Sequence, residues 1–279
     1  QILPVRFALP LLLSKEKRAS EMTDLAALAK AAEQTDGSLL GTFTGEDLVE
    51  TFAPYFMPDI IKDKQLDTEK LRTVLQELQT IAAHCDMVEK YKKGERASNE
   101  WDLPSAMQAV LCQISGFNDA MFDLAIINLV KGDYTSFENA YIPTVEIGVN
   151  ANTKQADLAK EFAAFVMSRE VQDGDFYDGF PVNKESLHMQ VSLDRSDYAA
   201  YTTIEGADGQ EIGLDIEPIK AADADKLEAL CDSLSKKTVK DAKVLEELKK
   251  SVPDYLLGRQ SLDDTISKIQ DGVKIYLAE

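Results

Sequence analysis

"GVNANTKQADLAKEF", residues 148–162, joins a strand-like run of sequence to a helix-like one. The apolar run that precedes it, 141–149, has the length and the β-branched content of a strand. After it, Leu158, Phe162 and Phe165 are spaced so that they share one face of a helix. The turn between them offers no catalytic nucleophile, metal-ligand set or phosphate-binding loop. The crossing therefore calls for a structural or binding role.

The composition limits the partners that this chain can have. The 279 residues are 44% hydrophobic and include 30 Lys and Arg against 49 Asp and Glu, a net charge of −19. An acidic surface repels nucleic acid and anionic membranes, so we expect no nucleic-acid partner. The length suits one large domain or two modest ones.

The sequence predicts neither a membrane span nor a disulfide framework. The apolar run 8–13 is far shorter than the roughly 20 residues of a membrane helix and is broken by Pro10. No signal peptide is recognisable, and the chain begins at Gln1 inside an apolar run. Three cysteines stand far apart without a CxxC pair, which argues against a structural zinc site and favours buried apolar roles.

The hydrophobic pattern predicts a helix-rich α/β chain with few strands. We expect helices over 23–34, 44–54, 67–83, 105–114, 117–131, 154–168, 223–234, 241–257 and 261–277, and strands over 1–13, 38–43 and 141–150. The segment 173–187 is rich in turn residues, and 191–222 is expected to be loop with short strands.

The residue types that usually carry catalysis are scarce. His84 and His188 are the two histidines, and His84 cannot pair with adjacent Cys85, because neighbouring side chains on a helix point about 100° apart. The motifs GxGxxG, GxxxxGK[ST], GxSxG and HExxH are absent. Carboxylate pairs such as Asp263 and Asp264 are most simply solvated, although acids that meet in space could serve glycoside hydrolysis.

Several aromatic residues lie in predicted connectors, where they could either pack in the core or stack on a ligand. They are Trp101, Tyr134, Phe137, Tyr141, Phe176, Tyr177 and Phe180.

Four stretches resemble segments of the family 1 extracellular solute-binding proteins of bacterial ABC importers. "IPTVEIGVNANTKQADLAKEFAAFVMSREVQ", 142–172, is similar to that family's hinge strand, its GINA-S/T-K turn and the helix that follows. "DGFPVNKESL", 178–187, contains the family's G-x-P-V-N-K segment. At the C-terminus, "GRQSLDDTISKIQDGVKIYLAE" resembles the closing helix, and "LPVRFALPLLL", 3–13, resembles the first hinge crossing. An unrelated α/β domain with one amphipathic helix is the alternative.

The resemblance implies an α/β fold of the type II periplasmic-binding-protein kind, present here mainly as the C-terminal lobe. On that view 1–148 begins this lobe at hinge 1, 149–204 is an excursion that would complete the N-terminal lobe, and 205–279 finishes the C-terminal lobe with helices. The N-terminal lobe segment, with its signal peptide and lipid-bearing cysteine, has no counterpart here. We therefore expect exposed apolar surface, and either self-association or a repacked helix 154–168.

The function that the resemblance implies is binding without catalysis. The chain would be an extracellular receptor, lipid-anchored at the cell surface in its full-length form, that binds a small solute between two lobes and docks on an ABC permease. A sugar or oligosaccharide is the favoured solute, although 243–246 lacks the aromatic residue that sugar-binding members often carry there. No cofactor is expected. Two alternatives remain: a protein–protein interaction module, and a glycoside-active enzyme with paired carboxylates.

Five residues near the implied hinge crossings and the connector 98–104 are the predicted ligand-binding residues. They are Arg6, Phe7, Trp101, Tyr141 and Glu146. No catalytic or metal-binding residue is predicted.

Overall fold

A mixed sheet forms the centre of the molecule. The computed structural model describes residues 2–174 and 178–278. The long first strand, β1 (Ile2–Ser14), pairs antiparallel with β8 along its first half and with β6 and β7 along its second half, and it also pairs with β9. A short parallel strand, β12, extends the sheet beyond β8. The partner strands are β6 (Ala109–Ile114), β7 (Asp133–Ser136), β8 (Ala140–Gly148), β9 (Phe180–Pro181) and β12 (Lys236–Lys237).

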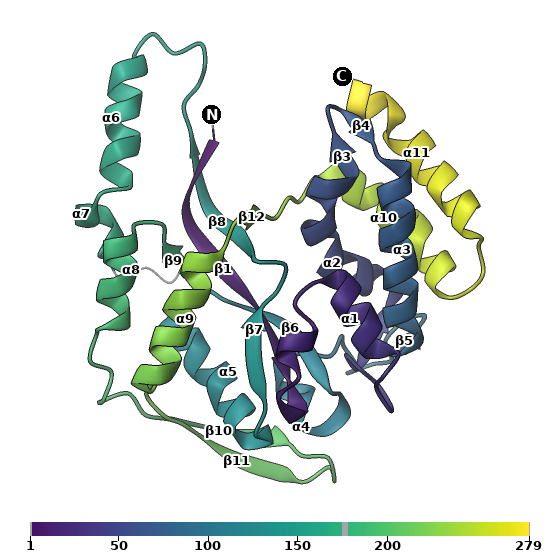
Figure 1. The fold of residues 1–279 in the computed structure, drawn as a ribbon, viewed down its shortest axis with the longest axis horizontal. Coiled ribbons are helices and arrows are strands. Elements are labelled where there is room, and N and C mark those ends of the chain that lie inside the picture. The colour runs from purple at the N-terminus through teal and green to yellow at the C-terminus, as the bar shows by residue number, and fades with distance from the viewer. Residues whose placement is uncertain (1, 175–177, 279) are drawn as a thin grey trace.

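Helices cover both faces of this sheet, with a separate hydrophobic cluster on each side (Figure 1). Successive residues of a strand point to opposite faces, so Leu12 packs in one cluster while Leu11 and Leu13 pack in the other. The first cluster is closed by α1 (Leu25–Ala32), α2 (Gly45–Ile60), α3 (Thr68–Ala83), α10 (Ala242–Leu256) and α11 (Leu262–Ala278). The second is closed by α5 (Phe117–Val130), α8 (Lys184–Val191), α9 (Ala221–Ser233) and the hairpin of β10 (Ala200–Glu205) and β11 (Glu211–Ile216).

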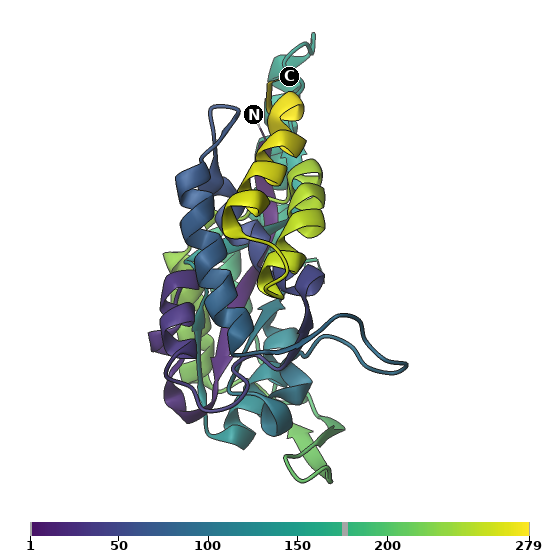
Figure 2. The same cartoon turned by 90° about the vertical axis from the view of Figure 1, so that its right-hand side faces the viewer.

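Shorter strands and helices are attached to this three-layer body. Two further strand pairs are β2 (Thr42–Thr44) with β5 (Asp86–Val88) and β3 (Ile61–Lys62) with β4 (Gln65–Leu66). The short helices are η1 (Lys15–Lys17), η2 (Ala19–Glu21), η3 (Glu100–Asp102), α4 (Leu103–Ala106) and α7 (Arg169–Gln172). In side view, the connector between β5 and η3 and the β10–β11 hairpin project from the body (Figure 2).

The helix predicted over 105–114 is wrong. The chain forms α4 and then β6, which pairs with residues 9–14 of β1. Along β6, Ala109 faces the first cluster and Val110 the second, the alternation of a strand buried on both sides. Apart from the exposed Gln113, β6 is apolar, so its sequence looks like that of a buried helix.

Several predicted boundaries also change. Helix α2 does not stop near Pro54 but continues to Ile60, because its apolar residues beyond Pro54 are buried in the first cluster. The helix expected to begin at Thr23 begins at Leu25, and Asp24 caps it by accepting from the amide of Ala27. The strand expected over 38–43 is β2, shifted to Thr42–Thr44.

The short strands expected within 191–222 are those of the β10–β11 hairpin. Residues 175–177 of the turn-rich segment, and with them Phe176 and Tyr177, lie outside the described residues.

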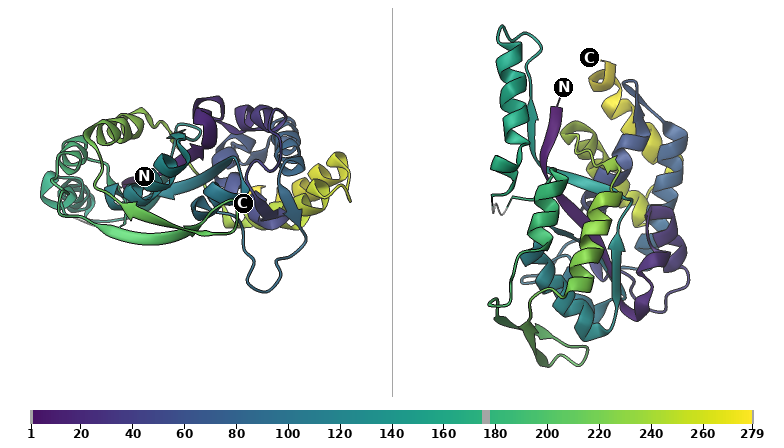
Figure 3. Two further views of the ribbon diagram at one scale, coloured as in Figure 1. Left: turned by 90° about the horizontal axis from the view of Figure 1, so that it is seen from below. Right: turned by 60° about the vertical axis from the view of Figure 1, so that its left-hand side comes forward.

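Helix α6 (Ala156–Val166) stands out from the body beyond the end of β8 (Figures 1 and 3). The face defined by Leu158, Phe162 and Phe165 is 62%, 60% and 47% exposed, respectively. Ala163 is the buried residue of this helix. The helix is therefore not repacked onto the body, and its apolar face is open to solvent.

Candidate functional site

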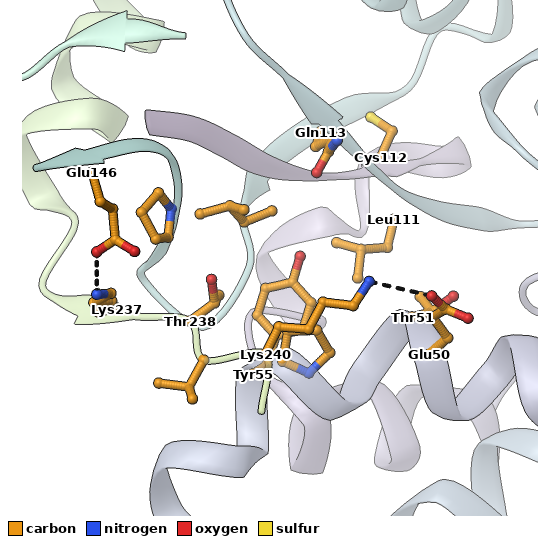
Figure 4. A pocket seen from close by; sticks show the side chains of 14 residues that line it. Glu50, Thr51, Tyr55, Leu111, Cys112, Gln113, Glu146, Lys237, Thr238 and Lys240 are labelled. Carbon is orange, nitrogen blue, oxygen red and sulfur yellow. Dashed lines mark hydrogen bonds and ion pairs between the residues drawn. The ribbon is translucent and has the colours of Figure 1, made fainter. Parts of the chain in front are cut away.

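A cavity of about 610 Å³ opens on the α2 side of the central sheet. Four segments far apart in the sequence form its walls: α2, the middle of β6, the middle of β8, and the residues 237–240 that run from β12 toward α10 (Figure 4). We call it the β12 cavity.

Two backbone hydrogen bonds hold the segment 237–240 across this cavity. The amide of Thr238 donates to the carbonyl oxygen of Tyr141 at 3.0 Å, and the amide of Val239 donates to the carbonyl oxygen of Pro54 at 3.0 Å. The segment is thereby tied to β8 on one side and to α2 on the other. The position of α2 is secured in turn by Thr44, whose side chain accepts from the amide of Asp47 at the start of the helix.

Neutral hydrogen-bonding groups face the interior of the β12 cavity. Tyr55, Thr51, Thr238 and Gln113 line it, and the polar side-chain atoms of these four residues have no hydrogen-bond partner in the described part of the chain. Burial raises the pKa of the Tyr55 phenol, so this hydroxyl stays neutral and can donate. Tyr55 and Thr238 are largely buried, Thr51 is half-buried and Gln113 is exposed, and all four groups are open to a ligand in the cavity.

An ion pair lies on each side of these neutral groups (Figure 4). Lys237 is bonded to Glu146, and the ammonium of Lys240 lies 3.3 Å from Oε1 of Glu50. Hydrogen bonds from Lys249 and then from Lys240 lower the pKa of Glu50, which is therefore ionised at neutral pH.

Apolar side chains complete the walls. Leu111, Ile142, Pro143, Pro54 and Val239 line the same cavity. Apolar walls with a few placed polar groups are typical of small-molecule sites. The arrangement can exchange hydrogen bonds with a ligand that carries many hydroxyls while its walls cover the carbon skeleton.

Of the five predicted ligand-binding residues, the structure places Glu146 in this cavity. Phe7 is buried and packs against Phe180, with ring centroids 5.7 Å apart, and against Tyr141 at 6.3 Å. Tyr141 packs on the second cluster, across the sheet from the cavity. Arg6 is 2% exposed, its Nε lies 3.9 Å from Oδ1 of Asp178, and burial lowers its pKa.

Trp101 lies apart from these residues. It sits in η3 and meets Phe122 of α5 edge to face, with ring centroids 6.1 Å apart. The other connector aromatics that the structure describes, Tyr134, Phe137 and Phe180, are buried in the two clusters. These three residues therefore pack in the core, which was the alternative to stacking on a ligand.

Sequence reasoning missed most of the residues that line the cavity. Tyr55 follows Phe52 at a helical spacing and looks like an ordinary core residue of α2. Thr238 belongs to the run KKTVK between two predicted helices. This run is the one sequence signal that could have identified Thr238 as a cavity residue. Their meeting depends on the tertiary packing of α2 against β8 and β12.

The described residues contain no cluster of three or more His, Cys, Asp or Glu side chains able to hold a metal ion. Within the same residues, no helix has the length and apolar character needed to cross a membrane. Cys85, Cys112 and Cys231 form no disulfide; Cys231 is buried as predicted, whereas Cys85 and Cys112 are partly exposed, and desolvation raises the pKa of each thiol.

Comparison with solved structures identifies the fold. The sugar-binding protein MalE from Xanthomonas citri superposes with a TM-score of 0.58 at 13% identity, covering 99% of this chain and 70% of that protein. A sugar transporter from Rhizobium etli in an open conformation gives 0.57 at 14% identity, covering 98% and 72%. A periplasmic solute-binding protein from Pectobacterium atrosepticum gives 0.55 at 12% identity, covering 100% and 73%.

These similarities establish the class of fold. The chain has the MalE-like, type II fold of periplasmic binding proteins, as the motifs predicted. No protein family model matches the sequence. No curated protein matches it either.

Proposed function

We propose that this chain is the solute-binding receptor component of an ABC importer and that it binds a carbohydrate in the β12 cavity without chemical change. The observation that carries the proposal is a set of hydroxyl and amide groups that face the cavity and have no hydrogen-bond partner among residues 2–174 and 178–278; they belong to Tyr55, Thr51, Thr238 and Gln113. The fold shared with proteins described as sugar-binding supports it.

Carbohydrate chemistry suits this lining. A sugar ring presents hydroxyls around its edge and C–H groups on its faces, so it can satisfy Tyr55 and Thr238 while resting on Leu111 or Val239. An apolar solute would leave the polar groups unpaired, at a cost of roughly 1–3 kcal/mol for each buried one. The cavity therefore selects for a hydroxylated ligand.

The receptor mechanism follows from the division of the chain proposed above. Residues 1–148 and 205–279 would form one lobe, and 149–204, with α6 at its tip, would reach toward a second lobe. Binding would favour the conformation in which the lobes close on the solute, and the closed form would dock on the permease. Such a receptor works outside the cytoplasm, and a lipid anchor in the full-length protein would keep it at the cell surface.

The glycoside-active alternative is less well supported by the cavity. A glycosidase needs one carboxylic acid with a raised pKa to protonate the leaving group. In the cavity, Glu50 has a lowered pKa, and Glu146 is bonded to Lys237. Two carboxylates that are both paired with lysines favour binding over acid catalysis.

Replacing Tyr55 by Phe tests the proposed site. Because the Tyr55 hydroxyl has no partner in the described chain, we expect unchanged thermal stability and a sugar affinity about 2- to 10-fold weaker, the value of one hydrogen bond. Isothermal titration calorimetry with the best-binding sugar measures the affinity.

Tyr91→Phe is the matched control. The Tyr91 hydroxyl donates to Asp47 at 2.7 Å and lies outside the cavity. Its loss should lower stability and leave the affinity unchanged. An affinity that is the same in Tyr55→Phe and in the unmodified chain would place the binding site elsewhere.

A further inference from the structure

The two lysines that line the β12 cavity among the described residues are held in different ways. Lys237 is bonded to Glu146, and the side chains of both residues are about one-third exposed. Lys240 is 61% exposed, and its ammonium is 3.3 Å from Glu50. Lys240 is therefore the cation of the cavity that is held more loosely.

Glu50 does not depend on Lys240 for its partner. Its second carboxylate oxygen, Oε2, accepts from Lys249 at 2.8 Å, a shorter contact than that of Lys240. The hydrogen bond from Lys249 is also the largest cause of the lowered pKa of Glu50. Lys240 can turn toward a ligand while Glu50 stays ionised and paired, so the exchange leaves no buried charge without a partner.

We propose that the solute is a carboxylated sugar, a uronic acid or an oligosaccharide that contains one, and that its carboxylate replaces Glu50 as the partner of Lys240. This inference rests on the proposed function. Tyr55, Thr51, Thr238 and Gln113 bind the hydroxyls, and the solute carboxylate reaches the end of the cavity where Lys240 lies (Figure 4). A charge-assisted bond of this kind is roughly twice as strong as a neutral one.

The overall charge of the chain does not prevent this pairing. The net charge of −19 repels anions at long range, but at physiological ionic strength that repulsion is screened beyond about 8 Å. The contact with Lys240 acts well within this distance. The repulsion slows the encounter, while the contact decides which sugar is retained.

One comparison of ligands and variants tests the inference. The probes are D-glucuronate, D-galacturonate and their oligomers, each beside its uncharged methyl ester and its neutral parent sugar, titrated by calorimetry at low and at physiological salt. We expect the acids to bind about tenfold more tightly than the esters, with a preference that shrinks as salt rises. Lys240→Met should abolish the preference for the acids over the esters, because it removes the cation that the solute carboxylate would contact.

Lys243→Met is the matched control. Lys243 is bonded to Glu247 on α10 at 2.7 Å and does not line the cavity, so its loss should preserve the preference for acids. Equal affinity for acids and esters, or a preference that survives Lys240→Met, would overturn the inference and leave the carbohydrate receptor intact. Absence of binding by every sugar, charged or neutral, would overturn the proposed function itself.

Discussion

At the scale of single residues, burial decides what each polar side chain can do. The Tyr55 hydroxyl has no hydrogen-bond partner in the described part of the chain, and so it is available to the proposed ligand. Asp123 of α5 shows another result of burial. Its carboxylate lies 3.6 Å from the Cys112 sulfur, and burial first, then Glu100, raises its pKa to about 7. Asp119 also contributes to this increase.

The raised pKa of Asp123 makes stability depend on pH. Between about pH 4 and pH 7 the folded chain keeps the Asp123 proton that the unfolded chain releases. The contribution of Asp123 to the free energy of unfolding is therefore fully present below about pH 4 and is lost as pH rises to about 7. Asp123→Asn removes this loss. We therefore expect the unfolding free energy of the variant, relative to that of the unmodified chain, to rise by on the order of 3 kcal/mol from pH 4 to pH 8. Urea unfolding at several pH values measures the difference.

Asp225→Asn, on the exposed surface of α9, is the control and should follow the unmodified chain. If the stability of Asp123→Asn stays parallel to that of the unmodified chain over the same range, Asp123 is not the buried acid described here.

At the scale of elements, periodicity predicts amphipathic helices well and buried strands poorly. The faces of α3, α10 and α11 follow a 3.6-residue spacing, and these helices lie close to their predicted bounds. Ser261 caps α11 by accepting from the amide of Asp264. Strand β6 has no such signal, since apolar residues on both of its faces pack in the two clusters and its pairing with β1 is a long-range contact.

The exposed face of α6 predicts self-association. Leu158, Phe162 and Phe165 form an apolar stripe that projects from the body, and burying it against a second copy would remove apolar surface from water. We expect light scattering to show a mass that rises with concentration, and Phe162→Glu to return the chain to a monomer.

Lys160→Glu places the same charge on the opposite side of α6 and should leave the association unchanged. A concentration-independent monomer before any substitution would contradict this prediction.

At the scale of the whole molecule, the fold was more predictable than the site. The motifs of 148–187 are made of residues that are neighbours in the sequence and form turns and helices. Such local patterns remain recognisable at 12–14% identity to the superposed structures. The cavity is built from α2, β6, β8 and the segment 237–240, which meet only after folding. Glu146 was predicted because it lies on the stretch that resembles a hinge crossing, and it lines the cavity; no sequence pattern pointed to Tyr55.

The central claim is that this chain binds a carbohydrate, and a thermal-shift panel tests it most directly. The panel compares neutral and acidic mono- and oligosaccharides with peptides and inorganic anions. At a hundredfold excess over Kd, a ligand stabilises the folded chain by about 2.7 kcal/mol, which is readily measured. We predict that a subset of the carbohydrates raises Tm and that peptides and simple anions do not. A rise in Tm with a peptide, or no rise with any carbohydrate, would contradict the account.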